Sequence, residues 1–171
     1  DTAAVMGADT ILVVPGRLTS EIRYDHAMDR LIESLSHVAP HAEQTGVNVA
    51  VEQVWNKFLV SPLDMKRVIT AVDSERVGNY MDTGNMVFWN FPEHWIGILG
   101  PWIKKIHFKD FKHEGGKVAF TQLGEGHVNW PAVMSAIGDV GYDDAVISEV
   151  GGDDEQMAET ARIMRELLDQ G

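Results

Sequence analysis

Short apolar runs alternate along this chain with longer segments of helical spacing. This pattern predicts βαβ units and a parallel sheet. We expect five strands, at residues 10–16, 47–52, 77–82, 103–109 and 145–149. The first is rich in β-branched residues and stops at Pro15-Gly16, as a strand buried on both faces would. The architecture is therefore expected to be α/β.

Helical segments are predicted at 2–6 and after each strand. Residues 20–44 carry apolar side chains mostly three or four positions apart, which form one face: Ile22, Met28, Leu31, Ile32, Leu35 and Val38. Ser61-Pro62 begins the next helix, because serine caps free amides and proline suits the first turn. Further helices cover 92–99, start at 129–131 and run from about 154 to 168. Residues 82–85 have the composition of a tight turn, and residues 113–126 are expected to form a glycine-bearing loop.

The number of units leaves the fold open at this point. A five-stranded doubly wound sheet is complete at 171 residues, whereas a (β/α)₈ barrel typically needs ~250 residues and eight units. Periodicity alone therefore favours the doubly wound fold. We find no linker or domain boundary within 1–171.

Charge and composition exclude several classes of protein. Fourteen Lys and Arg against 26 Asp and Glu give a net charge of -12, which repels nucleic-acid phosphates. The longest apolar stretches, such as 11–15, fall short of the ~20 residues that a membrane helix needs. The chain has no cysteine, which excludes disulfides and thiolate sites and is compatible with a reducing cytoplasm. It begins at Asp1 rather than methionine, so its start looks processed or cut.

Four predicted strands end in residues that can bind a metal. They are Glu52, Asp82, His107 and Glu149. Singly, each has an ordinary explanation as a strand boundary, a turn former or a core histidine. In parallel α/β folds, however, ligands bind at the carboxyl ends of the strands, so the four side chains would share one rim. Three carboxylates and one imidazole favour Mn²⁺, Mg²⁺ or Co²⁺.

A divalent ion would also offset the mutual repulsion of the three carboxylates. It could polarise a substrate carbonyl as a Lewis acid, acidify the adjacent C–H bond and stabilise an enediolate. Glu52 and Glu149, on opposite sides of the ion, could then remove and return the proton. This is isomerase or epimerase chemistry.

Several short sequence segments resemble those of one known family. Residues 51–56, 77–85, 106–110, 123–130 and 141–143 together with Glu149 are similar to the sugar-phosphate isomerase/epimerase family. Its members, among them ketose 3-epimerases and L-xylulose-5-phosphate 3-epimerases, have the xylose-isomerase-like TIM barrel. The resemblance implies that this chain is the carboxyl-terminal part of such a barrel, with strands four to eight, which reverses the preference drawn from periodicity.

The resemblance also implies roles for particular residues. Glu52, Asp82, His107 and Glu149 would be the metal ligands, with zinc also acceptable, and Glu52 and Glu149 would be the acid/base pair. Asn85 stands where some epimerases have a histidine, and we expect it to contact substrate. Lys109 is a candidate for a substrate hydroxyl or phosphate, although a lysine at a strand end is as often merely solvated.

Substrate and reaction remain open. Lys112, Gly115, Gly116 and Lys117 lie where TIM barrels often bind phosphate, whereas Asp153 and Asp154 at the next helix entrance would compete with an anion. The alternatives to an epimerase are a dehydratase like the inosose dehydratases and a catalytically silent half-barrel that binds or oligomerises. Five of eight strands leave apolar edges, so we expect a missing amino-terminal half or a homo-oligomer.

Overall fold

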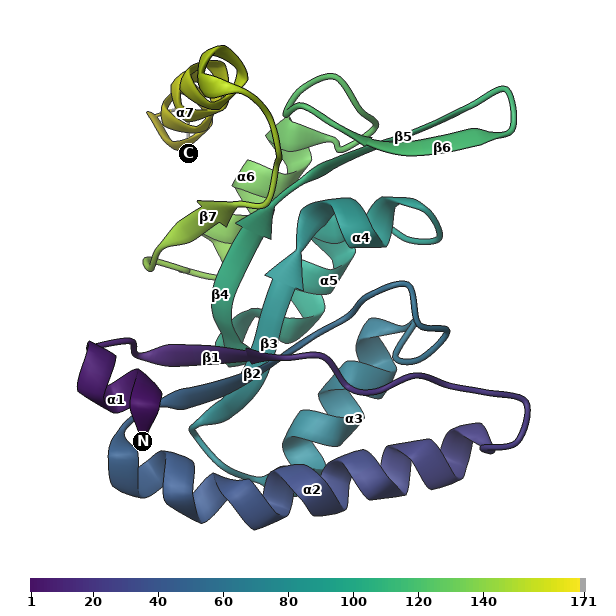
Figure 1. Ribbon diagram of the computed structural model, residues 1–171, viewed down its shortest axis with the longest axis vertical. Coiled ribbons are helices and arrows are strands. Elements are labelled where there is room, and N and C mark those ends of the chain that lie inside the picture. The colour runs from purple at the N-terminus through teal and green to yellow at the C-terminus, as the bar shows by residue number, and fades with distance from the viewer. Residues whose placement is uncertain (170–171) are drawn as a thin grey trace. The chain divides into compact units, whose positions relative to one another are not determined.

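The computed structural model describes residues 1–169 and contains a five-stranded sheet (Figure 1). The strands are β1 (Thr10–Val13), β2 (Asn48–Glu52), β3 (Val77–Asp82), β4 (Ile103–Phe108) and β7 (Val146–Ser148). The pairs β1–β2, β2–β3 and β4–β7 are parallel. The strands follow one another in chain order, without the reversal that a doubly wound sheet requires. The doubly wound alternative is therefore wrong, and the order is that of a (β/α)₈ barrel.

All five predicted strands are confirmed, with small differences at their ends. β3 has the predicted bounds, whereas β1 ends at Val13, before Pro15. Proline has no N–H group to donate to a neighbouring strand, which limits how far such a strand extends. β7 comprises only 146–148, so Glu149 follows the strand directly.

The helices also follow the prediction closely. They are α1 (Thr2–Met6), α2 (Tyr24–Thr45), α3 (Pro62–Val72), α4 (Thr83–Val87), α5 (Pro92–Leu99), α6 (Trp130–Asp139) and α7 (Asp154–Asp169), with a short 3₁₀ turn, η1 (Gly100–Trp102). Residues 83–85, within the segment of turn-like composition, begin α4, and Asp82 caps this helix. Among the helices of residues 1–169, none has the length and apolarity to cross a bilayer.

The loop expected at 113–126 is the main correction to the predicted elements. It contains most of an antiparallel hairpin of β5 (Asp110–Glu114) and β6 (Lys117–Thr121). Gly115 and Gly116 form its turn with φ of 57° and 78°, values that favour glycine. Lys112, His113 and Glu114 make β5 look like a polar loop in the sequence, because most of the hairpin is exposed.

The chain divides into two compact units. The first unit comprises Asp1–Tyr80 with Trp102–Lys105. In it, α2 lies beside α3 (Figure 1). Met28 and Leu35 of α2 are buried as the apolar stripe predicts, whereas Val38 is 41% exposed. The predicted cap of α3 is confirmed, since Ser61 Oγ accepts a hydrogen bond from the Leu63 amide at 3.2 Å.

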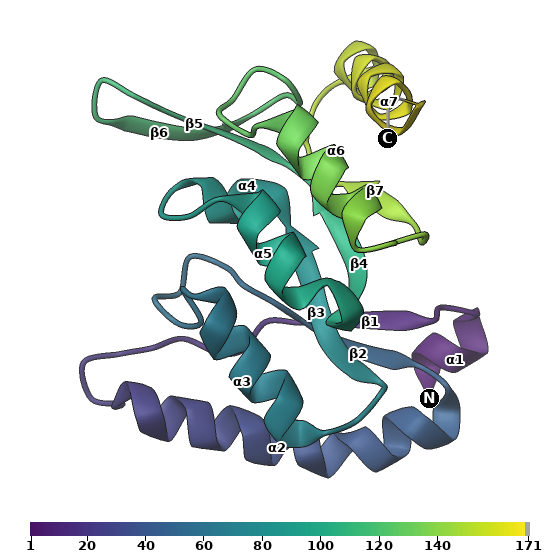
Figure 2. The same cartoon turned by 180° about the vertical axis from the view of Figure 1, so that it is seen from behind.

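The second unit comprises Met81–Pro101 and the described residues from Ile106 onward. Here α5 and α6 pack side by side (Figure 2). Both helices carry buried apolar side chains, among them Trp95, Ile96 and Leu99 of α5 and Val133 and Ile137 of α6. Asn129 caps α6, as predicted, by accepting a hydrogen bond from the Ala132 amide.

β1 and β7 are the two edges of the sheet. Ile11 and Leu12 of β1 are 41% and 39% exposed, and Ile147 of β7 is 39% exposed. Bare apolar edges of this kind favour pairing with further strands. A missing amino-terminal half or a second copy at these edges remains a prediction.

Tyr24 provides a test of packing within the first unit. Its hydroxyl donates a hydrogen bond to Asp64 Oδ2 at 2.7 Å, and burial together with this carboxylate raises the pKa of Tyr24 to about 12. The unfolded chain loses this proton near pH 10, so the free energy of unfolding should fall as the pH rises from 10 to 12. We expect Tyr24→Phe to remove up to about 2 kcal/mol of that fall, allowing for partial exposure. Urea titrations of both proteins at pH 8, 10 and 11.5 measure it. An equal fall in both proteins would contradict the assignment.

Candidate metal centre

Three of the four predicted metal ligands lie together in the second unit. Asp82 ends β3, His107 lies in β4, and Glu149 follows β7. His107 Nδ1 is 3.8 Å from Asp82 Oδ2 and 3.5 Å from Glu149 Oε2. One ligand atom from each of the three residues lies within 4.8 Å of the others. Two carboxylates and an imidazole at this spacing could hold one divalent ion between them.

Local structure explains how each side chain is presented. Asp82 is fully buried, and its Oδ1 accepts a hydrogen bond from the Asn85 amide at 2.6 Å as the cap of α4, while Oδ2 is the atom nearer to His107. The His107 side chain is only 12% exposed. Beyond the end of β7, the Glu149 amide still donates a hydrogen bond to the Phe108 carbonyl at 3.0 Å. This bond extends the β4–β7 pairing far enough to bring Glu149 to His107.

Lys109 takes part in the same cluster. Its Nζ lies 2.8 Å from Glu149 Oε2 and 3.8 Å from Asp82 Oδ2, and its side chain is 13% exposed. The ordinary explanation, that Lys109 is merely solvated, is therefore wrong. Its backbone is held by Thr83, whose Oγ1 accepts from the Lys109 amide at 3.0 Å. A Cβ on Gly84 would lie 2.8 Å from Lys109 Cγ. The Lys109 side chain can pack against residue 84 only because that residue is glycine.

These neighbours set the charge of Glu149, whose side chain is 47% exposed. Partial burial alone would raise its pKa. Hydrogen bonds with Lys109 and Asp82, and the charges of Lys109 and His107, outweigh that effect and hold the pKa of Glu149 below its usual value. Glu149 is therefore an ionised carboxylate at neutral pH, which is the form that binds a metal or accepts a proton.

Glu52 and Asn85, the two remaining site candidates, lie in different units. Glu52 is in the first unit at the end of β2, where its Cα is in register with Tyr80 of β3. It is buried, with 4% exposure. Asn85 is in the second unit, in the first turn of α4, and is also 4% exposed. Its role toward substrate remains a prediction.

Sequence analysis missed the role of Asp110, which is fully buried at the start of β5. Its carboxylate accepts five hydrogen bonds of 2.8 to 3.2 Å, from the amides of Phe111, Gly124, Gly126 and Val128 and from the Trp130 indole. A Cβ on Gly126 would collide with this carboxylate. The glycines at 124 and 126 were the available signal. Asp110 thus fixes the loop that leads from β6 to α6.

The segment considered for phosphate binding has other contacts. Gly115 and Gly116 form the hairpin turn, and Lys112 pairs with Glu114 at 3.3 Å. At the start of α7, the Gln156 amide donates to Asp153 Oδ1 at 2.9 Å. The amides of Gly124 and Gly126 are bound to Asp110. The amides of Gly124 and Gly126 and the side chain of Lys112 are therefore already engaged within the protein.

The family model described as "xylose isomerase-like TIM barrel" matches residues 1–167. This chain belongs to that family. The membership confirms the resemblance drawn from the sequence and the α/β barrel architecture that it implied.

The chain spans about half to three fifths of the curated relatives that it matches. It is 23% identical over 177 residues to an uncharacterized protein of Methanocaldococcus jannaschii, covering 96% of this chain and 58% of that protein. It is 25% identical over 147 residues to an inosose dehydratase of Lacticaseibacillus casei, covering 75% of this chain and 49% of the enzyme.

Solved structures share the fold. The IolI protein with a bound zinc atom matches with a TM-score of 0.86 and 17% identity, over 99% of this chain and 66% of that one. A D-tagatose 3-epimerase-like protein matches with a TM-score of 0.85 and 20% identity, over 98% and 64% of the two chains. A xylose isomerase-like TIM barrel protein from Mycobacterium smegmatis in complex with magnesium matches at 0.78 and 21% identity, over 98% and 63%. At these identities the likeness concerns the fold alone.

Proposed function

We propose that this chain belongs to a metal-dependent isomerase or epimerase that acts on a sugar. The observation that carries the proposal is the cluster of Asp82, His107 and Glu149, whose ligand atoms meet at the ends of three strands. In barrels of this type the reaction takes place at the carboxyl ends of the strands. Family membership and the sugar-converting enzymes among the similar proteins support the same choice.

We propose Glu52 as the fourth ligand. It ends β2 as Asp82 ends β3, and its register partner Tyr80 precedes Asp82 by two residues. Carboxylate oxygens with one imidazole nitrogen fit Mn²⁺, Mg²⁺, Co²⁺ or Zn²⁺. Zinc and magnesium are the metals named for two similar structures. Such an ion, when bound, would supply Lewis-acid polarisation of a substrate carbonyl.

The residues themselves would move the proton. Glu149 is the carboxylate whose neighbours favour its ionised form, so it would accept a proton from the substrate carbon next to the carbonyl. Glu52, the other member of the proposed acid/base pair, would deliver a proton to the opposite face of the same carbon, and the configuration there would invert. If the proton went instead to the former carbonyl carbon, an aldose and a ketose would interconvert. Lys109 would keep Glu149 oriented through their 2.8 Å contact.

Dehydration of a cyclic polyol is the second candidate. It is favoured by the match to the inosose dehydratase over 75% of this chain. The same proton abstraction would then be followed by loss of a hydroxyl as water from the neighbouring carbon. Product analysis by NMR distinguishes the reactions, because an epimerase leaves the molecular formula unchanged and a dehydratase removes water. A protein that binds metal but converts no sugar would instead be the silent module.

Metal binding is the direct test of the site. We expect Asp82→Ala and His107→Ala each to weaken divalent-metal binding by about 10²-fold or more, because each removes one ligand. Asp29→Ala and His37→Ala are matched controls, since both residues are exposed on α2. Metal content after dialysis against a weak chelator, followed by calorimetry, measures the effect. If both site variants keep wild-type metal content, the proposed site is wrong.

A further inference from the structure

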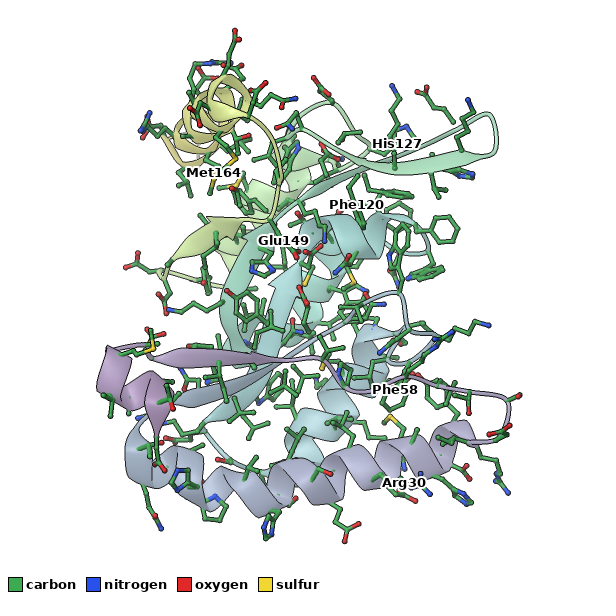
Figure 3. All side chains as sticks on the ribbon, in the orientation of Figure 1. Arg30, Phe58, Phe120, His127, Glu149 and Met164 are labelled. Atoms are coloured by element: carbon green, nitrogen blue, oxygen red, sulfur yellow. The ribbon has the colours of Figure 1, made fainter. Side chains whose placement is uncertain are left out.

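A hollow of about 310 Å³ adjoins Glu149 within the second unit. Phe120, Thr121 and Gln122 line it from the end of β6, Glu125 from the following loop, and Glu149 to Gly151 from the segment after β7. Figure 3 labels Phe120 on the hairpin and Glu149 beyond β7. The volume is at the small end of ligand pockets in proteins, which suits a ligand the size of a monosaccharide. No step proposed above uses the hollow.

Hydrogen bonds connect the segments that line the hollow. Gln122 Nε2 donates to the Gly151 carbonyl at 2.9 Å, and Gln122 Oε1 accepts from Thr160 Oγ1 of α7 at 3.0 Å. Asp110 holds the amides of Gly124 and Gly126, which flank Glu125. These bonds fix both sides of the hollow in the protein as it stands. Because these walls are already ordered, a ligand that binds here loses little free energy to ordering them.

The hollow combines an aromatic face with carboxylates. Phe120 is 47% exposed, although its ring contacts the buried Phe111 edge-on at 5.9 Å and lies 4.2 Å from Lys109 Nζ. Lys109 in turn contacts Glu149, so Lys109 links Phe120 to the metal cluster. The titratable residues that line the hollow are Glu125 and Glu149, both acidic. An aromatic ring offers an apolar surface to the C–H face of a sugar, and a carboxylate accepts hydrogen bonds from hydroxyls. The carboxylate of Glu125 also repels a phosphate, whereas that of Glu149 is paired with Lys109.

We propose that this hollow binds the part of the substrate remote from the reacting carbon, and that this part is neutral and hydroxylated. Phe120 contacts its C–H face, and Glu125 accepts hydrogen bonds from its hydroxyls. The proposal rests on the proposed function, because it uses the same metal cluster. It deepens that function by selecting free sugars over sugar phosphates and by making the β5–β6 hairpin the element that determines specificity.

The test compares Phe120→Ala with Phe91→Ala in the metal-loaded full-length protein. Phe91 is a matched control, since it is another exposed phenylalanine of the second unit and does not line the hollow. The probes are free ketohexoses and the 6-phosphates of the same sugars, with binding followed by saturation-transfer NMR and KM by turnover. We expect free sugars to bind and Phe120→Ala to raise their KM by about tenfold. Phe91→Ala should leave KM unchanged, Phe120→Tyr should restore it, and the metal affinity of all three variants should stay within about twofold of wild type.

The possible failures can be told apart. If the wild-type protein neither binds a divalent metal nor converts any sugar, the proposed function is wrong. With metal binding intact, an unchanged KM in Phe120→Ala, binding of the phosphates alone, or no binding of any free sugar would each overturn the hollow as the substrate subsite. Glu125→Lys supplies a second readout, since it should admit the 6-phosphates and weaken free-sugar binding. The opposite result would contradict the proposal.

Discussion

Replacing Glu149 with glutamine is expected to lower kcat by about 10²-fold or more at saturating metal, because glutamine keeps the shape of the side chain but accepts no proton. Glu149 Oε2 lies 3.5 Å from His107 Nδ1 and 2.8 Å from Lys109 Nζ. Both neighbours help hold the pKa of Glu149 below its usual value. Glu52→Gln should have a comparable effect if Glu52 is the other member of the pair. Turnover of free ketoses, measured with the metal content of each variant, gives the result.

Two further measurements make this prediction decisive. Glu155→Gln replaces an exposed carboxylate in the first turn of α7 and should leave kcat unchanged. Turnover in D₂O should place deuterium at the carbon that changes configuration, since the carboxyl group of Glu52 that delivers the new proton exchanges with solvent. Wild-type kcat in Glu149→Gln would show that Glu149 is not the base, and the absence of deuterium after many turnovers would contradict transfer between two carboxylates.

Replacing Asp110 with alanine is expected to reduce the free energy of unfolding by about 3–5 kcal/mol, an effect typical of a buried charge network that loses one partner. The substitution leaves three loop amides and the Trp130 indole without their acceptor in a buried region. It also empties the space against which Gly126 packs. The free energy of unfolding of Asp110→Asn should lie between those of wild type and Asp110→Ala. The asparagine amide keeps one acceptor oxygen but places two N–H donors toward the loop. Equilibrium unfolding in urea measures these differences.

The control for Asp110 is Asp143→Ala. Asp143 is exposed in the loop before β7, and its loss should change the free energy of unfolding by no more than about 0.5 kcal/mol. Hydrogen exchange adds a local readout. The amides of Gly124, Gly126 and Val128 should exchange faster in the Asp110 variants than elsewhere in the second unit. A loss of less than about 1 kcal/mol in Asp110→Ala would mean that the loop holds its shape without the carboxylate.

Part of this protein could be predicted from its sequence because the information is local. The spacing of apolar residues predicted all five strands of the sheet, and Ser61 and Asn129 predicted where two helices begin. Strand ends could be located within a few residues. Because parallel strands deliver their carboxyl ends to one rim, the sequence also predicted that Glu52, Asp82, His107 and Glu149 would lie together. The structure places Asp82, His107 and Glu149 together, and Glu52 as the fourth ligand stays a prediction. The family could be inferred from short phrases, since they stand in the right order along the whole chain.

Other features depend on contacts between residues far apart in the chain. The sheet order that excluded a doubly wound fold comes from strand pairing, which periodicity does not encode. Lys109 was ambiguous in the sequence because its partner Glu149 lies 40 residues away. The hairpin was predicted as a loop because most of it is exposed to solvent. Asp110 was overlooked because most donors to its buried carboxylate lie 14 to 20 residues further along the chain. A buried charge is stable only where folding brings enough donors around it, so its role is decided by the tertiary structure.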